Sequence, residues 1–160
     1  MKILFLCLVA LFFTGLAKSE YSISVLTELP GVGLEIRNLN LQSDAFEIDE
    51  QGIEDFMMEK MEEYDIRLLS AIELDVMPGQ PYLEVVVDIA HAQGPSHLYT
   101  VELELRELAQ LQRPKSSVVV VALSTWERKT LGVANRPAAI YDAIDRLLRL
   151  FSDELKDMNS

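Results

Sequence analysis

The chain is poor in the residues that build many catalytic and metal sites. It contains one cysteine, Cys7, and two histidines among 160 residues. Cys7 lies in an apolar run near the amino terminus, so removal of that run would leave no thiol. Disulfides, thiolate catalysis and cysteine-ligated metals would then be excluded together.

Positive charge is also scarce. Lys and Arg number 14 against 26 Asp and Glu, which gives a formal charge of −12. Nucleic acid is therefore excluded as an expected partner, because binding to it requires a basic face. Binding to an anionic membrane surface is disfavoured for the same reason. The acidity favours solubility, and recruitment of a cationic partner is the alternative interpretation.

Residues 1–17 have the three-part form of a secretory signal peptide. Lys2 supplies the positive start, residues 3–13 form an unbroken apolar run, and Gly15 and Ala17 are small residues at −3 and −1 of a cleavage site. The run is shorter than the roughly 20 residues that cross a bilayer, so an uncleaved anchor is the less favoured alternative. We expect a periplasmic or secreted protein with one domain, residues 18–160, and no stable membrane insertion after cleavage.

Three alternating runs between residues 82 and 126 predict an antiparallel sheet. In residues 82–89 the apolar side chains recur at every second position from Leu83 to Ile89, which is the period of a half-buried strand. Residues 99–106 alternate in the same way. Residues 117–126 include four consecutive valines, so we expect this run to be the most buried of the three.

The remaining segments are expected to extend and cover this sheet. Further strands are expected at 32–39 and 66–69, whereas residues 21–25 fit either a strand or an extended lead-in. Amphipathic helices are expected from a cap at Asp49 to Tyr64, and from a cap at Asn135 to about Leu155. Residues 70–80 and 127–134 are expected to be irregular. The predicted fold class is α+β, a mainly antiparallel sheet of four or five strands with two helices packed on one face.

Two groups of side chains deserve consideration as chemical sites. His91 and His97 flank one loop and could bind a divalent metal together with Asp88, although a Gly-Pro loop between ligands is unlike the tight spacing of most zinc sites. Glu102 and Glu104 would share a face with other strand carboxylates and could form an acid/base pair. A solvated charged face is the favoured interpretation of these glutamates.

Trp126 ends the valine-rich run and carries two interpretations. It could line a ligand pocket together with Tyr99 and Tyr82, or it could fill the edge of the core. We favour the core edge. The first interpretation keeps a small-ligand carrier open as an alternative function.

The layout resembles a loosely defined group of small bacterial exported or periplasmic α/β proteins. The resemblance is carried by a leader, a strand, a closing amphipathic helix and four short motifs: Met61–Ile66, Pro81–Val85, Leu103–Leu105 and Ser124–Trp126. The order of elements is similar to that of the amino-terminal domain of the periplasmic protein TolB. The resemblance implies a compartment and a fold, and that group offers no activity to transfer. The residues Glu127–Lys129 depart from the Gly-rich sequence that usually follows the Trp.

The hypothesis that best fits these observations is a non-enzymatic protein-binding module of the cell envelope or periplasm, without a cofactor. It would use the uncovered sheet face, a free strand edge or the segment after the Trp. The alternatives are a carrier with an apolar cleft near Trp126 and a metal-dependent hydrolase using His91 and His97. The expected interaction surface consists of Trp126, Glu127, Arg128, Lys129, Glu102 and Glu104.

Overall fold

The structure is a computed structural model that describes residues 26–41, 48–91, 96–111 and 119–160. The predicted leader and the strand candidate at 21–25 lie outside these residues. No helix in the described ranges is both long enough and apolar enough to span a membrane.

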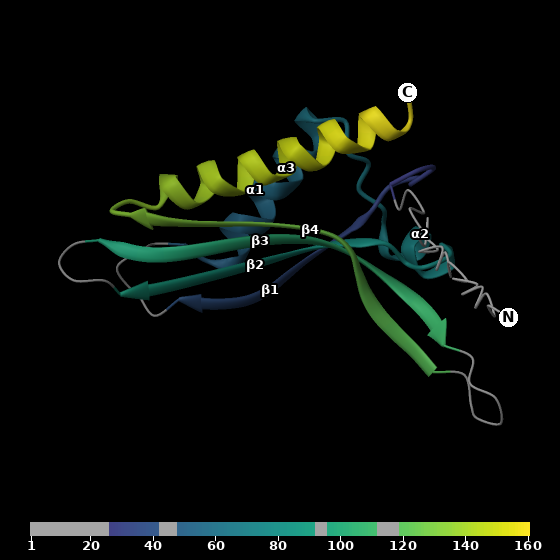
Figure 1. The fold of residues 1–160 in the computed structure, drawn as a ribbon, viewed down its shortest axis with the longest axis horizontal. Coiled ribbons are helices and arrows are strands. Elements are labelled where there is room, and N and C mark those ends of the chain that lie inside the picture. The colour runs from purple at the N-terminus through teal and green to yellow at the C-terminus, as the bar shows by residue number, and fades with distance from the viewer. Residues whose placement is uncertain (1–25, 42–47, 92–95, 112–118) are drawn as a thin grey trace, which may run out of the picture.

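Four strands form one mixed sheet in the order in which they occur along the chain (Figure 1). They are β1 (Gly33–Leu41), β2 (Tyr82–His91), β3 (His97–Leu111) and β4 (Val119–Ala134). The β2–β3 and β3–β4 pairs are antiparallel, whereas β1 runs parallel to β2. The predicted α+β class and mainly antiparallel sheet are therefore confirmed. The parallel pair is possible because the β1–β2 connection is long enough to cross over and carries two helices.

Helices α1 (Glu50–Glu63) and α3 (Ala138–Met158) cover one face of this sheet (Figure 1). Asp49 caps α1 as predicted, because its carboxylate accepts a hydrogen bond of 2.7 Å from the Gly52 amide. The core between the layers is built from side chains at alternate strand positions and from one stripe on each helix. Its fully buried members include Leu83, Val85, Val87, Leu103, Leu105, Ile53, Met57, Met61, Ile144, Leu148 and Phe151.

Several local expectations are corrected. A short helix, α2 (Ala71–Val76), lies in the segment expected to be irregular, and a Ser70–Glu73 capping box begins it. Residues 66–69 form an isolated bridge between Leu68 and Val32 in place of a strand. Arg136 precedes Pro137, and a residue before proline disfavours the helical region, so the last helix does not begin directly after Asn135. It begins after Pro137, which makes no side-chain capping hydrogen bond. The expected cap at Asn135 was wrong for this reason.

The valine-rich run is also less buried than expected. β2 begins at Tyr82, opposite Arg106, so the later part of β3 and the first part of β4 pair only with each other among the described strands. Thr125 is an extra residue in the β3–β4 ladder, and its hydroxyl donates to the Leu105 carbonyl at 3.2 Å. Bulges of this kind bend a strand and increase its twist. The two-stranded ribbon formed by residues 106–111 of β3 and 119–124 of β4 accordingly bends away from the sheet (Figure 1). Val120, in this ribbon, is 55% exposed.

Candidate functional site

The open face of the sheet carries a row of four glutamates, one from each strand. Strand register places Glu35 opposite Glu84, Glu84 opposite Glu104, and Glu104 opposite Glu127. Like charges directly opposite one another destabilise a sheet unless other groups compensate them. This row is the most unusual arrangement of charge in the described part of the fold, and it makes the open face the candidate site.

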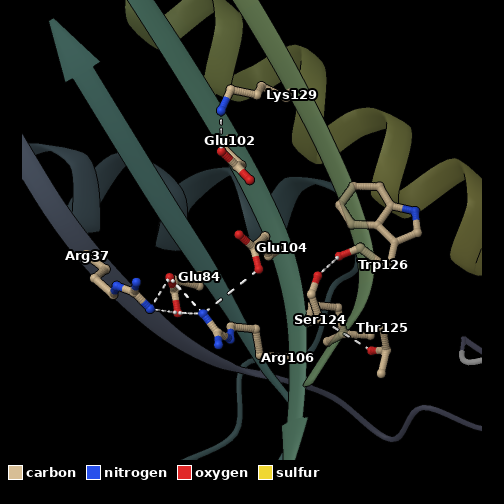
Figure 2. A network of polar contacts seen from close by, with 10 residues as sticks. Arg37, Glu84, Glu102, Glu104, Arg106, Ser124, Thr125, Trp126 and Lys129 are labelled. Atoms are coloured by element: carbon tan, nitrogen blue, oxygen red, sulfur yellow. Dashed lines mark hydrogen bonds and ion pairs between the residues drawn. The ribbon is translucent and has the colours of Figure 1, made fainter. Parts of the chain in front are cut away.

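Glu84 is the centre of the row and is almost fully buried, although it lies on the face that no helix covers. Two guanidinium groups close over its carboxylate: Arg37 approaches to 3.0 Å and Arg106 to 3.1 Å (Figure 2). A buried carboxylate needs such partners, since an unpaired charge out of water is very costly. The two arginines therefore link β1, β2 and β3 around Glu84.

Glu102 and Glu104 lie next to each other on β3 and have opposite pKa shifts. The hydrogen bond that Lys129 donates to Glu102 at 2.7 Å lowers the pKa of the Glu102 carboxyl. Burial raises the pKa of Glu104, and its hydrogen bond with Glu102 raises it further. Separated pKa values are a property of acid/base pairs, but an ion-paired structural network produces them as well. The Lys129 and Arg106 contacts account for this pair as a structural network on a charged face.

The expected interaction surface is divided between the two faces. Glu102, Glu104, Glu127 and Lys129 share the open face, because the register pairs Glu104 with Glu127 and Glu102 with Lys129. Trp126 faces the helix layer (Figure 2), and so does Arg128, which alternates with Glu127 and Lys129 along β4 and contacts α3. There, Glu154 of α3 accepts a hydrogen bond from the Trp126 indole at 2.7 Å and one from Arg128 at 2.6 Å.

The placement of Trp126 agrees with the core-edge interpretation. Its side chain is 8% exposed and its ring contacts Phe151 edge to face, with centroids 5.0 Å apart. Tyr99 lies on the same face as Trp126, whereas Tyr82 lies on the open face, opposite Arg106. These three aromatic residues therefore do not converge on one cleft.

The histidine candidates lie in paired strands, and His97 does not meet the third proposed ligand. His91 pairs with His97 through the backbone, and the side chain of His91 is outside what the structure describes. His97 is buried on the helix-side face, whereas Asp88 is exposed on the open face opposite Thr100. Across the described residues, no three His, Cys, Asp or Glu side chains are grouped as metal ligands.

A cluster of exposed apolar side chains occupies the far corner of the open face, and sequence analysis missed it. Leu98 of β3 is 44% exposed, and Leu131 and Val133 of β4 are 71% and 64% exposed. The segment 127–134 was expected to be a loop, whereas it is the second half of β4. The alternation of Lys129, Leu131 and Val133 with smaller residues was the available signal. We call Leu98, Leu131 and Val133 the apolar corner.

Comparisons with protein-family models, with curated proteins and with solved structures found no match. Any functional conclusion therefore comes from the chain's own residues.

Proposed function

We propose that the chain is a non-enzymatic protein-binding module that acts in the cell envelope or periplasm and engages its partner along the outer edge of β4. The observation that carries this proposal is the outer edge of β4, which has no partner strand among the described residues. β4 is 16 residues long and is the last strand in the sheet order. The apolar corner adjoins this edge.

Strand addition is the recognition mode that fits such an edge. The unpaired backbone groups of an edge strand provide affinity for an extended segment, and side-chain contacts provide the selection. In β4 the charged centre, Glu127–Lys129, disfavours nonspecific edge pairing, because charges on an edge strand oppose it. Leu131 and Val133, which follow this centre, offer apolar contacts to a partner. A segment that binds here would therefore bring apolar side chains to the apolar corner.

The compartment follows from the predicted leader. Residues 1–17 have the form of a signal peptide, and the remaining chain has no cysteine. A domain without thiols forms no unwanted disulfides in an oxidising compartment, and its hydrophobic core supplies its stability. The partner would then be another envelope or secreted protein.

Site-resolved crosslinking in the host tests the proposal. A photoreactive benzoylphenylalanine at position 131 should capture one discrete protein, whereas the same group at Asp157, exposed near the end of α3, should not. Leu131→Lys should abolish capture by a group placed at 133, because it puts a charge into an apolar contact. Leu150→Lys is the matched control, since Leu150 is 42% exposed on α3. Equal capture from positions 131 and 157, or capture unaffected by Leu131→Lys, would contradict the proposal.

A further inference from the structure

A hollow of about 450 Å³ lies in the helix layer between α1 and the first turns of α3. It is open to solvent, and its volume falls within the range of roughly 300–1,000 Å³ that is usual for ligand pockets. The aromatic rings of Phe56 and Tyr141 contribute to its lining, and they meet edge to face with centroids 5.0 Å apart. It is separate from the open face, because α1 and α3 cover the opposite side of the sheet (Figure 1).

All charged residues that line this hollow are carboxylates: Asp55, Glu59 and Asp142. No Lys or Arg lines it, and among the described residues no basic side chain pairs with these three. Asp55 accepts a hydrogen bond from Gln51, a neutral donor, at 2.8 Å. The hollow thus combines aromatic rings with exposed carboxylates that make no ion pair among the described residues, and both kinds of group attract a cation.

Gly52 shows that the position of Tyr141 depends on a small residue in α1. A Cβ atom at Gly52 would lie 3.1 Å from the Tyr141 hydroxyl and 3.0 Å from the Asp49 carboxylate. Glycine in a helix costs about 0.5–1 kcal/mol relative to alanine, yet here it leaves room for the tyrosine to lie against the first turn. Burial also raises the pKa of Tyr141, which keeps its hydroxyl neutral.

The helix already holds one ammonium group near the same aromatic ring. Lys60 Nζ lies 5.9 Å from the centroid of Phe56, within the range of a cation–π contact. Its ion pairs are made with Glu63 and Asp145, neither of which lines the hollow. The carboxylates of the hollow are therefore left to a cation from outside the described chain.

We propose that this hollow receives a lysine or arginine side chain from a basic segment of the partner protein. The exposed side of α1 argues for a peptide over a lone small ammonium ion. Beyond the hollow it carries further acidic residues, and Lys60 is its one basic residue. Neighbouring cations of an extended basic segment would find complementary charge there. The inference rests on the proposed protein-binding function and adds a second contact on the opposite layer from the β4 edge.

The test is a titration of the full chain at low salt, followed through backbone amide signals in NMR spectra. The probes are a capped Gly-Lys-Gly-Lys-Gly peptide, its Gln counterpart, and tetramethylammonium. The Lys peptide should shift signals of residues 52–59 and 138–142, and the Gln peptide should not. Glu59→Gln and Asp142→Asn should each weaken binding about two- to fivefold, as expected for one partly exposed charge contact.

Asp153→Asn is the matched control, because it removes the same charge from an exposed position on α3 away from the hollow. It should leave the affinity unchanged. The inference is overturned if the Lys peptide leaves the hollow unshifted, if Asp153→Asn weakens binding as much as Asp142→Asn, or if only tetramethylammonium binds. Crosslinking at position 131 reports on the β4 edge, so either proposal can fail while the other stands.

Discussion

Tyr99 of β3 lies directly against Gly132 of β4. The two residues are register partners, and a Cβ atom at position 132 would fall 2.5 Å from the tyrosine ring. Glycine usually weakens a strand, because it loses more conformational entropy on folding and has no side chain to pack. It is found in strands where another group approaches the backbone closely. Here the buried ring of Tyr99 covers the glycine, so two halves of the hairpin pack more closely than an alanine would allow.

We therefore predict that Gly132→Ala lowers the free energy of unfolding by about 1–3 kcal/mol, the usual range for overpacking. Urea unfolding monitored by circular dichroism measures the change. In a Tyr99→Ala background the same substitution should cost less, because the ring that it meets is absent. Equal costs in the two backgrounds would show that the contact is not responsible.

Local expectations succeeded where neighbouring residues determine the structure. The period-two pattern identified the buried positions of β2 and β3, and Asp49 was recognised as a cap because its partner lies three residues away. Helical spacing of apolar residues predicted the amphipathic helix after Asp49, and Ile53, Met57 and Met61 are its buried side chains. Each of these features depends on a short stretch of chain.

Features that depend on distant pairing could not be predicted in the same way. The glutamate row requires the register of three strand pairs, one of them parallel and joined by a long crossover. Val120 is apolar, but it is exposed because β2 begins opposite Arg106 and leaves the ribbon uncovered. Composition predicts that a run prefers burial, whereas the length of its neighbour decides whether it is covered.

Two adjacent methionines in α1 allow the core to be tested with matched changes. Met57 is fully buried, whereas Met58 is 38% exposed. Met57→Ala should lower the free energy of unfolding by about 2–5 kcal/mol, because it removes buried methylenes and leaves a cavity. Met58→Ala should change it by about 0.5 kcal/mol or less. Similar losses from the two variants would contradict the placement of α1 on the sheet.

Breaking the central ion pair of the glutamate row should also destabilise the fold. Glu84→Gln leaves the largely buried Arg106 with only its longer contact, 3.9 Å to the Glu104 carboxylate. Loss of one partner from a fully buried pair costs about 3–5 kcal/mol, and the partial exposure of both arginines reduces our expectation to about 1–3 kcal/mol. Glu35→Gln is the control, because Glu35 occupies the same row but is exposed. Its effect on urea unfolding should stay within about 0.5 kcal/mol.

The opposite pKa shifts of Glu102 and Glu104 predict opposite dependences of stability on pH. Burial raises the pKa of folded Glu104 above its ordinary value of 4.5, so the folded state binds more protons than the unfolded state above pH 4.5. Its contribution to stability therefore declines as pH rises from 4.5 through the raised value. Lys129 lowers the pKa of folded Glu102, whose contribution is present above pH 4.5 and is lost as pH falls through the lowered value.

At pH 7, Glu104→Gln should consequently raise the free energy of unfolding by about 0.5 kcal/mol, and Glu102→Gln should lower it by a similar amount. The gain from Glu104→Gln should disappear below pH 4.5, where the wild-type carboxyl is protonated in both states. The loss from Glu102→Gln should persist to a lower pH before it vanishes. Urea unfolding of the three proteins between pH 3 and 8 measures these differences. A parallel series in about 0.5 M salt weakens the contact between Lys129 and Glu102 by screening. A stability difference of the same sign for both variants at pH 7 would be inconsistent with the described network.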